Sequence, residues 1–129
     1  MVAMSFISEK EGNFLLNIAR LAIKAKLNKE SFNLYKMPYK RLDDEKRGLF
    51  VTLTENNELR GCIGNLEPIY TIYQAVIKNT VAAAFNDTRF RAVKRDELEM
   101  IEIELSILSQ LERVEFTSKE DLLDRIIEG

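Results

Sequence analysis

Residues 48–64, with the sequence GLFVTLTENNELRGCIG, decide the expected fold. The first half of this stretch is rich in β-branched and aromatic residues, a composition typical of a strand. Asn56 and Asn57 follow, and asparagine tolerates the left-handed backbone that a tight turn requires. The second half, from Glu58 to Gly64, again suits a strand. The stretch therefore predicts a β-hairpin.

The register of this hairpin can be predicted, because a slip of one residue moves every side chain to the opposite face. A loop with an even number of residues would set Arg60 against Leu53. A loop with an odd number would set Thr54 opposite Glu58 and gather the apolar residues on one face, so we predict the odd loop. The expected pairs are then Leu53–Leu59, Val51–Gly61 and Leu49–Ile63 on the apolar face, with Thr52–Arg60 and Phe50–Cys62 on the other.

Two helices are predicted to flank the hairpin. Each begins with a capping box, in which two side chains three residues apart satisfy free backbone donors at the helix start. The apolar spacing that follows extends the first helix to about Leu27 and the second to Asn86. The boxes are formed by Ser8 with Glu11 and by Thr71 with Gln74.

The remainder of the chain predicts one more strand and one more helix. Residues 101–107 alternate apolar with acidic or hydroxyl side chains, which indicates a strand with one buried and one wet face. An acidic stripe could suggest a metal site, but neighbouring carboxylates along one face do not converge as metal ligands must, so we interpret it as the exposed face of a strand. The stripe consists of Glu97, Glu99, Glu102 and Glu104. Ser118 with Asp121 predicts a last helix. The expected fold is α+β, a mainly antiparallel sheet with flanking helices in a single domain over residues 1–129.

Composition excludes several classes of function. The 129 residues include no histidine and one cysteine, which rules out intrachain disulfides, histidine-dependent triads and the common Cys/His zinc sites. The net charge of -2 gives no overall attraction to nucleic acid or to an anionic membrane. The longest apolar run, from Val81 to Phe85, is far shorter than the roughly 18 residues that span a bilayer. With no secretory signal at its start, the chain is expected to be cytoplasmic.

The segment LRGCIG, residues 59–64, is the strongest candidate site. In an extended strand Arg60 and Cys62 would share a face about 6.6 Å apart, and a nearby cation favours the thiolate form of cysteine. Gly61 and Gly64 would let a ligand approach the backbone. The other interpretation is structural: a lone cysteine beside apolar residues is often a small core residue, and glycines can mark a bulge or a tight packing contact.

A set of segments along most of the chain matches the motifs of a known family. These segments are Gly48, Phe50 to Leu53, Leu59 to Gly64, Ala83-Ala84, Asp87 to Phe90, Glu97-Leu98 and Ile101 to Ser109. They resemble the motifs of the AMMECR domain family. Thr88 and Ala92 stand where the family has prolines. Family members also continue past the position of Gly129, so the chain resembles a shortened form of the domain.

The resemblance implies a suspected enzyme without an assigned reaction, and it specifies no cofactor and no metal. Cys62 would act as nucleophile or acid/base group on a nucleotide, a modified RNA base or another anionic small molecule. Family association suggests a Memo-like protein or a radical S-adenosylmethionine protein as a partner. No membrane partner is expected, given the net charge and the short apolar runs. The residues expected to bind the substrate are Arg60, Gly61, Gly64, Asp87 and Arg89.

Two alternatives remain open. The first is a noncatalytic interaction module, in which LRGCIG is a structural core strand and the last helix is covered by a partner or a second copy of the chain. That helix would offer the apolar residues Leu122, Leu123, Ile126 and Ile127. The second concerns the basic run from Arg89 to Arg95, which either contacts phosphates or forms a solvated loop.

Overall fold

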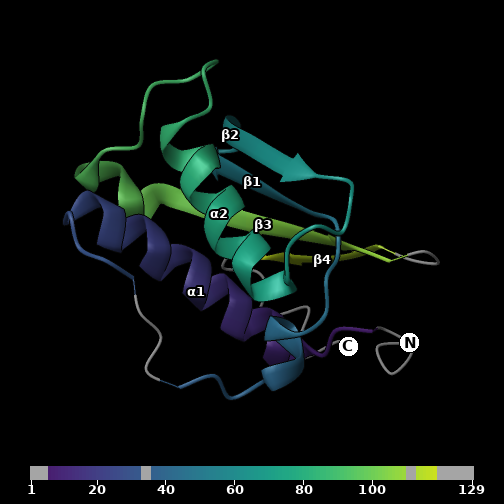
Figure 1. Cartoon of the computed structure of the whole chain (residues 1–129). Coiled ribbons are helices and arrows are strands. Elements are labelled where there is room, and N and C mark those ends of the chain that lie inside the picture. The colour runs from purple at the N-terminus through teal and green to yellow at the C-terminus, as the bar shows by residue number, and fades with distance from the viewer. Residues whose placement is uncertain (1–5, 33–35, 110–112, 119–129) are drawn as a thin grey trace.

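The computed structural model describes residues 6–32, 36–109 and 113–118 (Figure 1). The four strands form one sheet in the order β2-β1-β3-β4, and every neighbouring pair is antiparallel. Both long helices cover the same face of this sheet, which confirms the predicted α+β class. The elements are α1 (Glu9–Leu27), η2 (Lys40–Asp43), β1 (Leu49–Glu55), β2 (Glu58–Asn65), α2 (Ile72–Phe85), η3 (Arg95–Met100), β3 (Ile101–Leu108) and β4 (Arg113–Thr117).

The two helices begin where their capping boxes predict. The Ser8 hydroxyl accepts from the Glu11 N–H at 3.1 Å, and the Glu11 carboxylate accepts from the Ser8 N–H at 2.9 Å. Thr71 and Gln74 form the same reciprocal pair at the start of α2. Asn86 ends α2 as predicted, with its N–H bonded to the carbonyl of the preceding turn.

The core lies between the helices and the covered face of the sheet. Alternation places every second side chain of β1 and β3 on that face, where burial of each large aliphatic residue contributes about 1.5–3 kcal/mol. α2 packs on β1 and β2, so the chain that leaves α2 emerges beside the edge strand β2. The fully buried strand residues are Leu49, Val51, Leu53, Ile103, Leu105 and Ile107.

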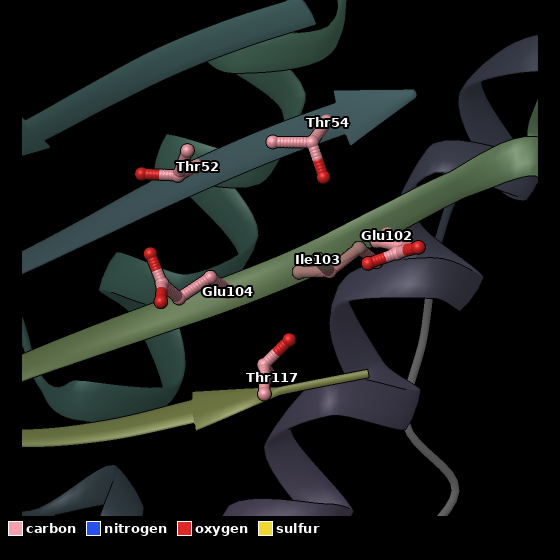
Figure 2. Close-up of a pocket in the computed structure, with 6 residues that line it drawn as sticks. All are labelled: Thr52, Thr54, Glu102, Ile103, Glu104 and Thr117. Carbon is pink, nitrogen blue, oxygen red and sulfur yellow. The ribbon is translucent and has the colours of Figure 1, made fainter. Parts of the chain in front are cut away.

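The other face of the sheet is mainly polar. A hollow of about 90 Å³ lies on this face, and the residues that line it are Thr52, Thr54, Glu102, Ile103, Glu104 and Thr117 (Figure 2). As predicted, Glu102 and Glu104 point away from the covered face, between the buried isoleucines and leucines of β3. Among residues 6–32, 36–109 and 113–118, no group of three or more cysteine or acidic residues is placed to hold a metal ion.

The hairpin turn is shorter than predicted. Asn56 and Asn57 form a two-residue turn with φ values of 54° and 66°, and Glu55 lies opposite Glu58. Positive φ at both central residues is the geometry that asparagine tolerates in tight hairpins. The prediction of an odd loop, with Thr54 opposite Glu58, is therefore wrong.

A bulge explains why the even loop is possible. Thr54 pairs with Leu59 and Leu53 pairs with Gly61, so Arg60 is an extra residue in β2. The odd loop was predicted because an even loop would pair Arg60 with Leu53. The bulge removes that pair, so the even loop no longer sets these two residues against each other. The predicted pairs are accordingly replaced by Leu53–Gly61, Thr52–Cys62, Val51–Ile63, Phe50–Gly64 and Leu49–Asn65.

The end of the described chain differs from the expectation in one respect. The strand β4, which the sequence did not predict, pairs with β3 at the sheet edge. Ser118, the predicted cap of a last helix, bonds the backbone of Ile103 through its own N–H at 2.8 Å and its hydroxyl at 2.6 Å. The predicted helix itself falls in residues 119–129, outside the described residues. Within the described part of the chain, no helix combines the length and the apolar character needed to cross a bilayer.

Candidate functional site

Cys62, the one thiol of the chain, lies half-buried on the edge strand β2. Its Sγ atom is 3.4 Å from the Thr52 Oγ1 atom of β1, within the range of a hydrogen bond to sulfur. Thr52 also lines the hollow on the polar face of the sheet (Figure 2). The thiol therefore lies beside a hydroxyl group on the face that the helices leave uncovered.

The outer edge of β2 at Cys62 is occupied by two side chains from the segment after α2. The Cys62 N–H donates to Asp87 Oδ2 at 3.0 Å, and the Cys62 carbonyl accepts from Arg89 Nη2 at 3.3 Å. A further strand would use these same backbone groups for pairing. The structure thus brings together three predicted site residues, Cys62, Asp87 and Arg89.

Asp87 and Arg89 form a close ion pair. Arg89 donates to the Asp87 carboxylate through its backbone N–H at 3.2 Å, its Nε at 3.0 Å and its Nη2 at 2.8 Å. The side-chain bonds from Arg89, followed by the bond from the Cys62 N–H, hold the pKa of Asp87 well below its usual range. Asp87 is consequently ionised at neutral pH.

Arg89 presents a positive charge to solvent at the edge of β2. Its side chain is 57% exposed, whereas that of Asp87 is 4% exposed. The guanidinium carbon lies 5.3 Å from the centre of the Phe90 ring, a cation–π distance. The hydrogen bond to Asp87 is the main cause that raises the pKa of Arg89.

Arg60 does not share a face with Cys62, and that prediction is wrong. Its Nε atom lies 3.7 Å from Glu55, which alternation along β1 puts on the face opposite Thr52. Cys62 contacts Thr52, so Arg60 and Cys62 point to opposite faces of the sheet. The bulge at Arg60 breaks the alternation that the prediction assumed.

The Arg60 side chain is instead engaged with the chain between α2 and β3. Its Nε and Nη2 atoms donate to the two carboxylate oxygens of Glu97, both at 2.9 Å. Nη1 donates to the Arg91 carbonyl at 2.7 Å, and Nη2 to the Ala92 carbonyl at 3.3 Å. The hydrogen bond from Arg60 is the main cause that lowers the pKa of Glu97 to about 2. A role of Arg60 in binding a ligand stays a prediction.

The two glycines of LRGCIG are required for close packing. A Cβ atom on Gly61 would lie 2.2 Å from the Ala83 carbonyl oxygen in α2. A Cβ atom on Gly64 would lie 2.3 Å from the Phe50 ring and 2.7 Å from the Leu49 carbonyl oxygen. The missing side chains therefore let the helix and the Phe50 ring approach β2, while contact of these glycines with a ligand stays a prediction.

Sequence reasoning missed two residues of this arrangement, Thr52 and Glu97. Thr52 would have been found beside Cys62 if the bulge had been recognised, because the observed register pairs them. Glu97 was predicted to lie on the exposed face of a strand, and that prediction is wrong: it lies in η3 with its side chain 12% exposed. Nothing in the sequence indicated that its partner would be Arg60.

The arrangement combines a thiol, a neighbouring hydroxyl and an exposed guanidinium. A cysteine near a positive charge can act as a nucleophile, and a guanidinium binds carboxylates or phosphates through paired donors. The ionised Asp87 fixes both the Cys62 peptide group and the orientation of Arg89. The edge of β2 is thus chemically suited to an anionic ligand.

Comparison with known proteins agrees with this architecture. A protein of Methanothermobacter thermautotrophicus is 41% identical over 122 residues, covering 89% of this chain and 60% of that protein. A protein of Methanopyrus kandleri is 38% identical, covering 91% of this chain and 58% of that protein. The crystal structure of an uncharacterised protein from Pyrococcus horikoshii matches with a TM-score of 0.74 and 38% identity, over 80% of this chain and 53% of that one.

The chain spans about 60% of the length of the curated relatives it matches. The AMMECR1 family pattern matches residues 16–129, which include the hairpin, the Asp87–Arg89 segment and the sheet. The chain belongs to the AMMECR1 family.

Proposed function

We propose that Cys62 is the reacting group of an enzyme site that takes an anionic small molecule, with a nucleotide or a modified RNA base as the preferred class. One observation carries this proposal: the backbone N–H of the single thiol residue is bonded to Asp87, and its backbone carbonyl is bonded to the exposed Arg89. Such an arrangement fixes the backbone of the residue that carries the thiol and presents a positive charge at the same strand edge.

Arg89, Thr52 and Cys62 would each have a separate role in this site. Arg89 would orient a phosphate or carboxylate of the ligand, because its guanidinium is exposed and fixed by Asp87. Thr52 would hold the Cys62 sulfur in position through their contact. Cys62 would serve as nucleophile or as acid/base group, and no cofactor is specified by these residues.

A noncatalytic interaction module is the second candidate. It is favoured by the packing of LRGCIG, since Gly61 and Gly64 fit against α2 and Phe50, and Arg60 bonds Glu97. The motif would then be a structural strand. Association through residues 119–129, or with a Memo-like or radical S-adenosylmethionine protein, remains part of this proposal.

Ligand protection of Cys62 distinguishes the two candidates. We expect a bound nucleotide or related anion to slow alkylation of Cys62 by iodoacetamide by roughly tenfold or more, because a bound ligand excludes the reagent. The rate is measured by mass spectrometry on the 129-residue chain against a panel of mononucleotides and modified nucleosides. Arg89→Ala should abolish the protection.

Arg91→Ala is the matched control, since Arg91 is an exposed arginine of the same segment that meets Arg60 only through its backbone carbonyl. It should leave protection intact. Failure of every anion to protect Cys62, or equal protection in Arg89→Ala, would favour the interaction module.

A further inference from the structure

We propose that Arg60 is a positioning residue for Cys62, which it affects through residues 87–94 and not by direct contact. In this arrangement Arg60 and Glu97 hold residues 87–94 against β2, and this segment in turn holds Asp87 and Arg89 on the Cys62 peptide group. The inference rests on the proposed function, because Cys62 is the group that is positioned.

Arg60 holds residues 87–94 through two backbone carbonyls of this segment. Its guanidinium donates to the consecutive carbonyls of Arg91 and Ala92, at 2.7 and 3.3 Å. A planar guanidinium with fixed donor directions can hold two carbonyls and a carboxylate in one geometry. Residues 91 and 92 are thereby fixed relative to β2.

Glu97 also binds residues 87–94, through the backbone of Lys94 at the end of this segment. Its carboxylate accepts both donors of Arg60 at 2.9 Å, and it also accepts from the Lys94 N–H at 2.8 Å. The side chains of Arg60 and Glu97 are 11% and 12% exposed. An ion pair so shielded from water resists opening more than a surface pair does.

The segment is short enough to transmit this restraint to Cys62. Residues 88–90 alone separate Asp87 from Arg91, and the Phe90 N–H bonds the Asp87 carbonyl at 3.0 Å. Val93 is buried, and its N–H bonds the Ala84 carbonyl at 2.8 Å. These bonds restrain Asp87, whose carboxylate accepts from the Cys62 N–H at 3.0 Å.

The bulge in β2 gives this arrangement its geometry. It turns Arg60 to the helix-covered side of the sheet, where the segment after α2 passes, while Cys62 keeps the polar face. A regular strand would direct both side chains to one face. The bulge therefore separates the thiol from the residue that positions it.

Hydrogen exchange at the Cys62 amide tests the inference without any ligand. In Glu97→Gln, we expect the Cys62 amide to exchange roughly tenfold faster relative to the Leu105 amide of the core strand β3, because local opening frees the Asp87 bond. Arg60→Lys, which keeps the charge but lacks the guanidinium fork, should give an intermediate ratio. Both rates are read by NMR on the full chain.

Glu11→Gln is the matched control. Glu11 likewise bonds an arginine, Arg41, at 2.9 Å, and accepts a backbone N–H from Ser8 at 2.9 Å, but it lies on α1. It should leave the Cys62-to-Leu105 exchange ratio unchanged. An unchanged ratio in both Glu97→Gln and Arg60→Lys would overturn the inference.

The two proposals fail separately. A raised exchange ratio without any ligand protection would leave the positioning role of Arg60 intact and remove the proposed enzyme function. Ligand protection with an unchanged exchange ratio would support the proposed enzyme function and overturn the positioning role of Arg60.

Discussion

Replacing Gly61 with alanine is expected to lower the free energy of unfolding by about 3 kcal/mol, the upper end of what overpacking usually costs. The added Cβ atom would lie 2.2 Å from the Ala83 carbonyl oxygen, which belongs to the backbone of α2. No side-chain rotation relieves that contact, so the helix must move away from the sheet. Urea unfolding followed by circular dichroism measures the change.

Gly12→Ala provides the control. Its Cβ would also meet an atom at 2.3 Å, but that atom belongs to the Phe116 side chain. In a Phe116→Ala background, Gly12→Ala should therefore cost little further stability, whereas Gly61→Ala has no such rescue. Wild-type stability in Gly61→Ala would contradict the close approach of α2 to β2.

Arg60→Ala is expected to lower the free energy of unfolding by about 3 kcal/mol at pH 7, because it leaves the Glu97 carboxylate shielded from water without its charged partner. It also removes the donors to the Arg91 and Ala92 carbonyls. Urea unfolding measures this loss, and Arg60→Lys should recover part of it.

The pH dependence identifies the ion pair as the cause. The pKa of Glu97 is lowered from 4.5 to about 2 in the folded chain. A lowered folded pKa contributes stability that is present above the unfolded value and is lost as the pH falls through the folded value. The difference between wild type and Arg60→Ala should thus shrink between about pH 4.5 and pH 2. A difference that stays constant across that range would assign the loss to packing alone.

Local sequence signals predicted most of the fold. Capping boxes at Ser8 and Thr71 gave the helix starts, because they depend only on residues three apart. The alternation from Ile101 to Ile107 predicted the strand β3, because one face of this strand packs on the core and the other faces away from it. The strand β4 was missed although Val114 and Phe116 alternate with polar residues as in β3. Five residues of alternation are a short signal, and the stretch had been assigned to no element.

The candidate site was predicted in part. Asp87 and Arg89 were placed with Cys62 because of a family resemblance, and the structure brings them to one strand edge. The position of Arg60 could not be predicted from regular strand geometry, since a single bulged residue reverses the face on which its side chain lies. Its partner Glu97 comes from 37 residues farther along the chain, a distance at which spacing rules carry no information.

The alkylation rate of Cys62 in the folded chain tests the central claim most directly, because a reacting thiol must be reachable without unfolding. We predict that iodoacetamide modifies the folded protein at a rate within about tenfold of the urea-unfolded chain at the same pH, as for a partly exposed thiol. Modification that occurs only as fast as the chain unfolds would contradict the claim and make Cys62 a core residue.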